Sequence, residues 1–336
     1  KNIKNISKVC KKYKIKLIYS DKIYKNLEKK IFKRIKINIL QTDDLYKLSD
    51  LDDKQQFVDE YFKSPNKIKS KQLNYYKNKI VLITGAGGSI GKNLFFEVLN
   101  LKPKKIILAE QDELKLFNLK KENENIKFNY KTQININFLL GNLSNDYFLK
   151  KIFLEEKNID CVLRASAYKH VGLGEENTLS FVKNNIFVTY NLAKISILQN
   201  VKKFIFISTD KAVNPKSVMG YTKSICEKIL INLNKKYNLK NFFKIVRFGN
   251  VINSDGSVLP IFEKQILNGG PLTVTNKNVS RFFMSIKNAC ELVLHTVEID
   301  KNIGLFILDM GKSYKILDIA KAMIDYYLKK KNSHQT

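Results

Sequence analysis

The sequence predicts an α/β protein that consists of a doubly wound parallel sheet and a smaller C-terminal lobe. Short, nearly continuous apolar runs recur from Lys79 onward, as in strands that are buried on both faces of a parallel sheet. Helical patterns lie between most of these runs, and repeated alternation of strand and helix is typical of a doubly wound sheet. After about Pro260 the alternation loosens, which indicates a separate, smaller lobe.

The first 75 residues differ from the rest of the chain. Residues 4–20 have the pattern of a basic helix that runs into a short strand, and residues 36–50 that of a strand followed by a polar connection. Residues 63–72, rich in Lys and Ser with one Pro, resemble a linker. We therefore expect residues 1–75 to be the tail of a preceding small α/β unit plus a linker.

The expected strands of the sheet follow in order along the chain. They cover residues 79–84, 105–110, 136–142, 160–166, 204–210 and 243–250. Helical patterns connect several of them, at residues 145–156, 179–198 and 218–236. In the C-terminal lobe we expect one more strand, at residues 305–310, and helices at residues 286–298 and 315–328.

A glycine-rich turn follows the first expected strand. Gly85, Gly88 and Gly91 are spaced G-x-x-G-x-x-G in "VLITGAGGSIGKNLFFEVL". Glycine permits positive φ and lets backbone amides approach a pyrophosphate at the positive end of a helix. Because a strand precedes the turn and an apolar-periodic helix follows it, we predict a dinucleotide site of the Rossmann type. Ser89 and Ile90 complete the turn and are further expected cofactor contacts.

An acidic residue stands at the expected distance from this turn. Glu110 ends the strand "KIILAE", where its carboxylate can accept hydrogen bonds from the two hydroxyls of an adenosine ribose. The same charge would repel a 2′-phosphate, so the predicted cofactor is NAD rather than NADP. Asp112 is a weaker candidate because it lies farther from the strand end. The alternative for Glu110 is a carboxylate that only starts the next helix.

Two residues at later strand ends are also expected to contact the cofactor. Asn142 closes the third strand, where its side-chain carbonyl could accept a hydrogen bond from the adenine amino group; an ordinary turn asparagine is the alternative. Ala165 follows the fourth strand.

Four stretches, the first of which is the glycine-rich turn, together resemble a known family. These stretches are "TGAGGSIG", "ISTDKAVNPKSVMGYTKS", "VRFGNVINSDGSVLPIF" and "SRFFMSI". With them, residues 79–329 resemble the nucleotide-sugar 4,6-dehydratases of polysaccharide and glycan biosynthesis, in the extended short-chain dehydrogenase/reductase superfamily. The combination of S-T-D-K with M-x-x-x-K is specific to this branch, which acts on UDP-N-acetylglucosamine (UDP-GlcNAc).

The resemblance implies an NAD-binding Rossmann domain, which we place at residues 76–258, and a substrate-binding lobe at residues 259–336. It implies a lyase that uses tightly held NAD: hydride leaves C4 of the sugar, water is eliminated across C5–C6, and hydride returns at C6. It also implies a UDP-sugar partner and a homo-oligomer. The long form of the family carries upstream transmembrane helices and a further C-terminal segment. We therefore expect a truncated fragment of that form, in the cytoplasm or on the cytoplasmic side of an inner membrane.

The strand "FIFISTDK" places the expected catalytic residues at its carboxyl end, where open α/β sheets bind ligands. Thr209 is suited to hold the 4-hydroxyl by a hydrogen bond. Asp210 would protonate the leaving 6-hydroxyl, and Lys211 would take the C5 proton if its amine is neutral. A second cation near Lys211, such as Lys223, would favour that neutral form. A solvated ion pair on a loop is the alternative for Asp210 and Lys211.

Met219 stands where a Tyr-x-x-x-Lys pair would have its tyrosine. Met219 and Lys223 are four residues apart and share one helix face, from which Lys223 could reach the nicotinamide ribose. Tyr221 points elsewhere on a helix and is expected to pack. A thioether cannot take the proton of the 4-hydroxyl, so Asp210, Lys223 through a ribose hydroxyl or water, or a water bound by Thr209 must do so. The sequence leaves these three open.

The predicted substrate contacts are drawn largely from the few arginines of this lysine-rich chain. Arg281 resembles the family position that meets the UDP diphosphate, and Phe282 and Phe283 beside it are expected to be core. Arg247 is either a substrate ligand or the partner of a buried carboxylate. Asn250 is expected to contact substrate or nicotinamide.

The loop after the fourth strand carries weaker signals. Lys169 is a candidate phosphate contact, and His170 is expected to be held by backbone rather than to act in acid–base work. Asn185 would buttress the cofactor loop as in the superfamily, or simply cap a water. Arg164 stands where the resemblance predicts a histidine, so the sequence assigns it no role.

The net charge of +29 at first suggests a nucleic-acid partner. However, the chain contains only four arginines, which lie at positions 34, 164, 247 and 281, and its lysines are dispersed through every segment. Specific readout of phosphates and bases relies on arginine forks. We therefore expect a solvated lysine surface and no specific nucleic-acid binding.

The four cysteines, Cys10, Cys161, Cys226 and Cys290, form no C-x-x-C pair and are expected to be free thiols in a reducing compartment. The sequence shows no metal-ligand spacing, no signal peptide and no apolar run long enough to span a bilayer. Two alternatives to the dehydratase remain. One is a UDP-sugar 4-epimerase, and the other is a non-catalytic Rossmann scaffold that binds NAD or nucleic acid.

Overall fold

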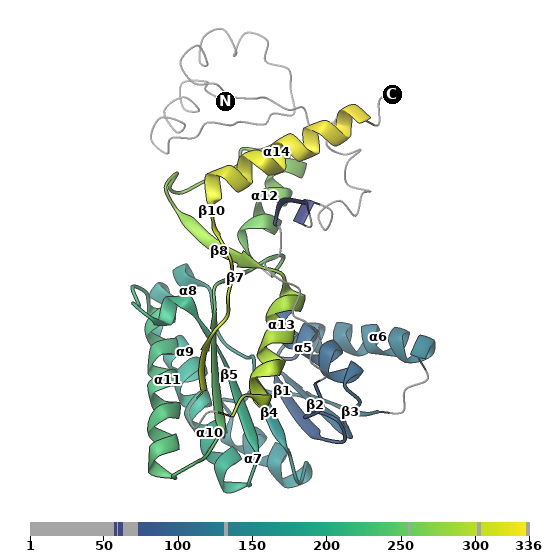
Figure 1. Ribbon diagram of the computed structural model, residues 1–336, viewed down its shortest axis with the longest axis vertical. Helices are drawn as coiled ribbons and strands as arrows, with labels where there is room; N and C mark the ends of the chain where they lie inside the picture. The colour runs from purple at the N-terminus through teal and green to yellow at the C-terminus, as the bar shows by residue number, and fades with distance from the viewer. Residues whose placement is uncertain are drawn as a thin grey trace. The chain divides into compact units, whose positions relative to one another are not determined.

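The computed structural model describes residues 57–58, 60–62, 73–130, 134–254, 256–300 and 304–333, which form two compact units. The sheet unit comprises residues 73–249 and 285–309 of this set, and the small unit comprises residues 57–62, 250–284 and 310–333. The elements of both units are labelled in Figure 1. The helix, the strands and the linker predicted before residue 57 and at residues 63–72 lie outside the described residues.

The sheet unit is built on seven strands in the order β3-β2-β1-β4-β5-β6-β9, and every neighbouring pair is parallel. The strands are β1 (Ile80–Thr84), β2 (Lys105–Glu110), β3 (Asn135–Leu140), β4 (Cys161–Arg164), β5 (Lys203–Thr209), β6 (Phe243–Phe248) and β9 (Gly304–Ile307). The chain moves outward from β1 to β3 and then returns to the other side of β1 with β4. This reversal creates a switch point at the carboxyl ends of β1 and β4. The predicted doubly wound sheet is confirmed.

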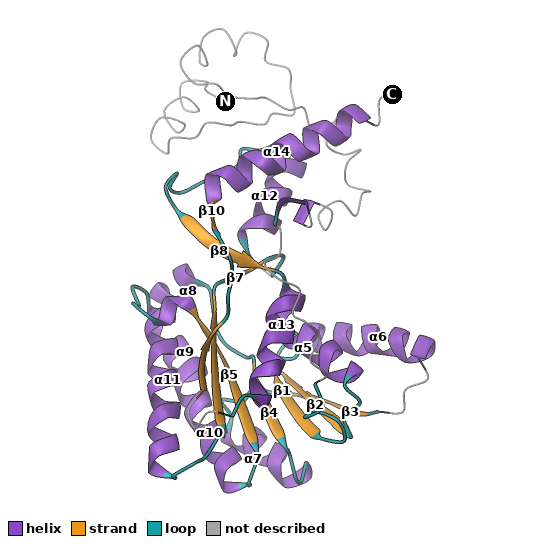
Figure 2. Ribbon diagram, viewed as in Figure 1, coloured by secondary structure: helices purple, strands orange, loops and turns teal. Residues whose placement is uncertain are grey.

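Helices cover the sheet between successive strands, as Figure 2 shows. They are α5 (Ser89–Asn100), α6 (Glu113–Tyr130), α7 (Asp146–Glu155), α8 (Val171–Glu176), α9 (Thr178–Phe181), the π-helix η1 (Val182–Phe187), α10 (Val188–Leu198), the 3₁₀ turn η2 (Asp210–Ala212), α11 (Val218–Lys236), α13 (Ile286–His295) and the 3₁₀ turn η3 (Thr296–Glu298). The expected single helix at residues 179–198 is therefore interrupted by a π-helical segment, a feature that often occurs at functional sites.

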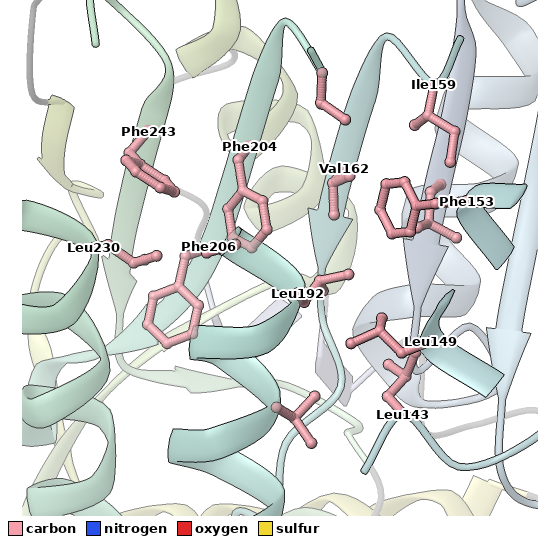
Figure 3. Packing of buried hydrophobic residues seen from close by; sticks show 14 of the residues in the cluster. Leu143, Leu149, Phe153, Ile159, Val162, Leu192, Phe204, Phe206, Leu230 and Phe243 are labelled. Carbon is pink, nitrogen blue, oxygen red and sulfur yellow. The ribbon is translucent and has the colours of Figure 1, made fainter. Parts of the chain in front are cut away.

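The main core lies between the sheet and α7, α10 and α11. Phe204 and Phe206 of β5 are fully buried and point to this face together, because strand residues two apart share a face. Leu192 of α10 and Leu230 of α11 pack against them in the same cluster (Figure 3). Ile205, between the two phenylalanines, is also fully buried although it points the other way. Burial on both faces explains the unbroken apolar runs of the sequence.

Polar residues set the helix ends. The side chain of Asn145 accepts hydrogen bonds from the N–H groups of Tyr147 (2.9 Å) and Phe148 (3.3 Å) and so starts α7. Ser217 starts α11 by accepting from Gly220 N–H at 3.2 Å. Asn200 and Asn238, after the ends of α10 and α11, take positive φ values of 58° and 47°. Asparagine tolerates this conformation and so stops the helix.

The described part of the small unit contains a three-stranded sheet in the order β10-β8-β7 together with helices. Its elements are β7 (Asn250–Val251), β8 (Ser280–Met284), β10 (Ser313–Lys315), α12 (Val258–Leu267) and α14 (Ile316–Ser333). Phe57, Val58 and Phe62 belong to its core, where the Phe62 ring lies 5.3 Å from that of Phe283. Part of the segment that we expected to be the tail of a preceding unit therefore completes this core.

The predicted domain boundaries differ from this division. The expected boundary near residue 258 lies after the start of the small unit at residue 250. Residues 285–309, expected in the C-terminal lobe, belong to the sheet unit: they supply α13 and the edge strand β9, which pairs with β6. A short apolar strand carries no signal for the sheet it joins, so the sequence could not reveal this crossing.

Candidate active site

The glycine-rich turn has the backbone geometry that its spacing predicts. Gly85 has a φ of +64°, and a side chain at this position would meet the backbone of Ser166 at 2.6 Å. A Cβ on Gly91 would lie 2.1 Å from the carbonyl oxygen of Gly85, so only glycine lets α5 start this close to the turn. Gly88 caps α5 without a side-chain hydrogen bond, and the first turn, with Ser89 and Ile90, holds no acidic residue. This arrangement suits an anionic ligand.

Glu110 lies beside the same turn, at the end of β2. Its Oε2 accepts a hydrogen bond from Gly87 N–H at 2.9 Å, and its Oε1 accepts from the N–H groups of Gln111 (2.9 Å) and Asp112 (3.1 Å). The carboxylate is therefore held in place by backbone amides and is largely buried. The sequence analysis did not single out Gly87, although a Cβ there would meet the side chain of Lys115 at 2.5 Å.

The two other expected cofactor contacts are placed differently. Asn142 is exposed, and its Oδ1 accepts from Ser144 N–H at 2.8 Å, which is the geometry of an ordinary turn asparagine. This hydrogen bond favours an ordinary turn asparagine over a residue that binds adenine. Ala165 lies at the switch point, where its N–H donates to the carbonyl of Thr84 at 3.2 Å.

Thr209, Asp210 and Lys211 form one hydrogen-bonded cluster at the carboxyl end of β5. Thr209 Oγ1 donates to Asp210 Oδ1 at 2.8 Å, and Lys211 Nζ lies 3.0 Å from the same oxygen. Thr209 Oγ1 also accepts from Lys211 N–H at 3.4 Å, which caps the 3₁₀ turn η2. The side chains of Asp210 and Lys211 are 37% and 32% exposed, so water or a ligand can reach the pair.

Met219 and Lys223 lie on the buried face of α11. Met219 is 5% exposed and Lys223 is 6% exposed, whereas Tyr221 between them is 54% exposed. Tyr221 therefore points away from this buried face, as expected, but it is exposed and does not pack, contrary to the expectation. Met219 and Lys223 share a face because they are four residues apart on a helix.

Lys223 is a buried amine with an altered proton affinity. Its Nζ donates to the carbonyl oxygen of Ile207 at 2.7 Å and lies 4.7 Å from the centre of the Phe206 ring. Burial lowers the pKa of Lys223 to about 7, and the positive charge of Arg164 contributes in the same direction. The cation that acts on Lys223 is thus Arg164.

A buried carboxylate, Glu227, lies one helical turn beyond Lys223 on the same face of α11. Glu227 Oε1 accepts hydrogen bonds from Ser208 Oγ and from Arg247 Nε, the latter at 2.9 Å, and Oε2 pairs with Arg247 Nη2. Arg247 is therefore the partner of a buried carboxylate, the second of its two predicted roles. The sequence analysis missed Glu227; an acidic residue at i+4 from Lys223, in the apolar stretch "SICEKIL", was its only signal.

Asn185 ties the loop after β4 to α11. Its Oδ1 accepts from Tyr168 N–H at 2.9 Å, and its Nδ2 donates to the Tyr168 carbonyl and to Thr222 Oγ1, both at 3.0 Å. Asn185 is 1% exposed and lies in the π-helix η1. These bonds are those of a buttress for the loop, the first of its two predicted roles. On that loop, Lys169 and His170 are exposed.

The two remaining predicted substrate contacts belong to the small unit. Asn250 starts β7, and Arg281 in β8 is exposed, with Nη1 donating to the carbonyl of Ser280 at 2.9 Å. Phe283 is in the core, as expected, but Phe282 is 43% exposed because neighbouring strand residues point to opposite faces.

Other features of the described residues bear on the class of site. Cys161, Cys226 and Cys290 are free and buried, as predicted, while Cys10 lies outside the described residues. No group of three or more histidine, cysteine, aspartate or glutamate side chains in this part of the chain is arranged to hold a metal ion. None of the described helices combines the length and the apolar character needed to cross a membrane.

The sequence of the chain is similar to a known protein family and to several characterised proteins. Residues 81–336 match the family described as "Polysaccharide biosynthesis protein". The chain is 42% identical over 247 residues to the capsular polysaccharide biosynthesis protein CapD of Staphylococcus aureus, covering 74% of this chain but only 40% of CapD. It is 34% identical to the UDP-N-acetylglucosamine 4,6-dehydratase (inverting) of Campylobacter jejuni, covering 74% of this chain and 72% of that enzyme. A UDP-glucose 4-epimerase of Rickettsia bellii is 32% identical, covering 69% and 66%.

Solved structures share the fold. Pen from Bacillus thuringiensis superposes with a TM-score of 0.69 at 35% identity, covering 76% of this chain and 75% of Pen. The dTDP-glucose 4,6-dehydratase DesIV of Streptomyces venezuelae, solved with NAD bound, gives a TM-score of 0.64 at 16% identity, covering 73% and 80%.

Proposed function

The chain belongs to the polysaccharide biosynthesis protein family, whose members include nucleotide-sugar dehydratases, and we propose that it catalyses the NAD-dependent 4,6-dehydration of UDP-GlcNAc. The product would be a 4-keto-6-deoxy sugar nucleotide for the synthesis of a surface polysaccharide or glycan. The observation that carries the proposal is the Thr209–Asp210–Lys211 cluster, because it holds an acid and a base side by side at the carboxyl end of a central strand.

The residues of the glycine-rich turn fit NAD. Glycine at position 91 lets α5 begin close to Gly85, so the N–H groups at the start of α5 could meet a pyrophosphate. Glu110 lies beside this turn, where the hydroxyls of an adenosine ribose would meet its carboxylate. The NAD-bound structure of DesIV supports the same cofactor. When bound, NAD supplies the acceptor and the later donor of hydride. Lys223 would hold the nicotinamide ribose.

Asp210 and Lys211 can reach the required protonation states by exchanging one proton. Their ion pair holds that proton on Lys211 Nζ, 3.0 Å from Asp210 Oδ1. Its transfer to Oδ1 yields a neutral amine and a carboxylic acid. Lys211 then takes the C5 proton while Asp210 gives its proton to the leaving 6-hydroxyl, which departs as water. This step returns both groups to the ion pair from which they started.

Thr209 and the substrate-binding residues would orient the sugar for this elimination. Thr209 Oγ1 lies close enough to Asp210 to hold the 4-hydroxyl on the same side as the acid. Arg281 is proposed to bind the UDP diphosphate, because its planar guanidinium matches two oxygens, and Asn250 and Lys169 are proposed as further contacts. We propose that Arg247 acts on the site through Glu227 and Ser208, because its guanidinium is committed to that carboxylate.

A UDP-sugar 4-epimerase is the second candidate, and the similarity to UDP-glucose 4-epimerases favours it. An epimerase shares the cofactor and the first hydride step but has no use for an acid and a base at C5–C6. The Asp210–Lys211 pair therefore supports the dehydratase over the epimerase. A scaffold that only binds NAD would need neither the pair nor the buried Lys223.

Proton NMR of UDP-GlcNAc incubated with the protein in deuterated water tests the proposal. A dehydratase produces a new C6 methyl signal and incorporates deuterium at C5, and the C5 configuration separates retention from inversion. Formation of UDP-N-acetylgalactosamine would establish the epimerase instead. An unchanged spectrum from a protein that still binds NAD and UDP would refute both enzymes for this chain.

A further inference from the structure

Arg164 is a buried cation that forms no ion pair with a carboxylate of the described residues. It ends β4 and is 0% exposed. Its Nη1 donates to the carbonyl of Ser166, and its Nη2 donates to the carbonyls of Asn184 (3.1 Å) and Asn185 (3.3 Å), while Nε has no partner. Among the described residues no carboxylate forms an ion pair with it. A buried guanidinium is usually paired, so this charge is unusual.

The hydrogen bonds of Arg164 fix its position. Asn184 and Asn185 lie in the middle of the π-helix η1, and Ser166 lies in the loop after β4. The guanidinium therefore connects the loop after β4 to the π-helix η1. Because its hydrogen bonds are all to backbone carbonyls, the position of the charge depends on the position of the chain itself.

A second buried cation lies against the same aromatic ring. The Cζ atom of Arg164 is 5.6 Å from the centre of the Phe206 ring, and Nζ of Lys223 is 4.7 Å from it. Lys223 forms no ion pair with a described carboxylate either. Glu227, one turn further along α11, is engaged by Ser208 and Arg247. Two like charges that are both buried repel each other strongly. Burial lowers the pKa of Arg164 only to about 10, so its guanidinium remains charged at neutral pH. The lysine is therefore the group that becomes neutral.

We propose that Arg164 is a positioning residue whose fixed charge favours the neutral amine of Lys223, and that this amine accepts the proton of the substrate 4-hydroxyl through a bridging hydroxyl or water. In this step the O–H bond breaks, and its electrons form the second bond of the C4 carbonyl. The proton ends on Lys223 Nζ, and the C4 hydrogen leaves with its electron pair to NAD. The amine thereby takes the role of the tyrosine that is absent at position 219, where the chain has methionine. The role of Lys223 as proton acceptor rests on the proposed function. The effect of the Arg164 charge on the protonation of Lys223, called the charge relation below, does not.

The other groups around Lys223 set the size of the expected effect. Burial is the largest cause of its lowered pKa, which lies at about 7, and Arg164 is the next. Cys226 and Glu227, on the same helix, act in the opposite direction. From the strands, Ile207 offers a neutral carbonyl, and Arg247 offsets the charge of Glu227. Loss of the Arg164 charge should therefore raise the pKa of Lys223 only part of the way to 10.5.

Lysine-selective ¹³C NMR of the full chain, followed as a function of pH, measures this directly. The Lys223 signal is assigned by its loss in Lys223→Met. Lys244 is an internal reference, because burial and Lys203 lower its pKa to about 8 and it does not depend on Arg164. In Arg164→Gln, which keeps a donor for the carbonyls, we expect the Lys223 midpoint to rise by about one pH unit. Lys244 should not change.

Lys228→Gln is the matched control, because it removes an exposed cation from α11, the helix that carries Lys223, and should shift neither midpoint. A Lys223 midpoint near 10.5 in the unaltered protein would refute the proposal without any variant. An unchanged Lys223 midpoint in folded Arg164→Gln would also refute it. In pre-steady-state C4 oxidation, the acidic limb of the pH profile should move with the midpoint. If the expected titrations occur but no sugar product forms, the proposed function and the proton-acceptor role fail, while the charge relation stands.

Discussion

At the scale of single residues, Lys211 offers the sharpest test of the proposed elimination. Lys211→Ala removes the base for the C5 proton but leaves C4 oxidation possible, so dehydration should fall by roughly 10²–10⁴-fold. Reduced cofactor should then accumulate and be visible by its absorbance. Lys216→Ala is the matched control, because Lys216 is exposed on the same loop. Full turnover by Lys211→Ala would exclude Lys211 as the base.

Lys223 should also leave a signature in the pH dependence of stability. Its pKa is about 7 in the folded chain against an ordinary value of 10.5, so between these pH values the unfolded chain binds more protons. Stability contributed by the neutral amine is therefore complete above pH 10.5 and is lost as the pH falls to 7. The slope is at most about 1.4 kcal/mol per pH unit. Denaturant titrations should show this extra slope in the unaltered protein and not in Lys223→Met; equal slopes would contradict the buried, neutral amine.

The residues that the sequence analysis identified and those it missed differ in one physical respect. Gly85 and Gly91 are constrained by the geometry of one turn, because Gly85 has a φ of +64° and a Cβ on Gly91 would lie 2.1 Å from the Gly85 carbonyl oxygen. The spacing of the two glycines along the chain records this constraint. Arg164 and Glu227 depend on partners that are distant along the chain: Arg247 lies 20 residues from Glu227, and Asn185 lies 21 residues from Arg164. The apolar strand around Arg164 predicts a buried position, but nothing in the sequence shows which groups accept hydrogen bonds from its guanidinium.

At the scale of elements, the junction of β1 and α5 depends on glycine at one position more than at others. In Gly91→Ala the new Cβ would lie 2.1 Å from the carbonyl oxygen of Gly85, so the turn must shift. We expect a loss of about 1–3 kcal/mol of stability and a large loss of NAD affinity, measured by denaturant unfolding and by calorimetry. Gly172→Ala in α8 is the control, because nothing lies within 4 Å of its Cβ. Equal behaviour of the two variants would contradict the close approach.

The elements themselves followed from the sequence, whereas their irregularities did not. Periodicity places α11 at residues 218–236, as observed, because its apolar face is continuous along the core. The π-helix η1 interrupts the helix that the sequence predicts at residues 179–198, although the apolar pattern continues through it. The carbonyls of Asn184 and Asn185 that it presents are the ones that bind Arg164. A one-residue change in helical hydrogen bonding is set by such tertiary partners, which a sequence pattern does not contain.

At the scale of the whole molecule, the chain leaves the sheet unit after residue 249 and returns to it at residue 285. The returning segment supplies β9, which pairs with β6 from Lys244↔Gly304 to Arg247↔Ile307. It also supplies α13, whose Cys290 Sγ donates to the carbonyl of Ile90 at the start of α5 at 3.8 Å. The segment thus supports both the strand that carries Arg247 and the helix at whose start we propose that the pyrophosphate binds.

Two truncated chains test this return. A chain that ends after Asp309 and one that ends after Met284 both lack β10 and α14, and they differ only in residues 285–309. Without β9, strand β6 becomes an edge, and without α13 the apolar face of α5 is exposed to water. We expect the longer chain to bind NAD and the shorter chain to lose both NAD binding and cooperative unfolding, as followed by calorimetry and circular dichroism. Equal affinity in the two chains would show that NAD binding does not require residues 285–309, as the sequence alone predicts.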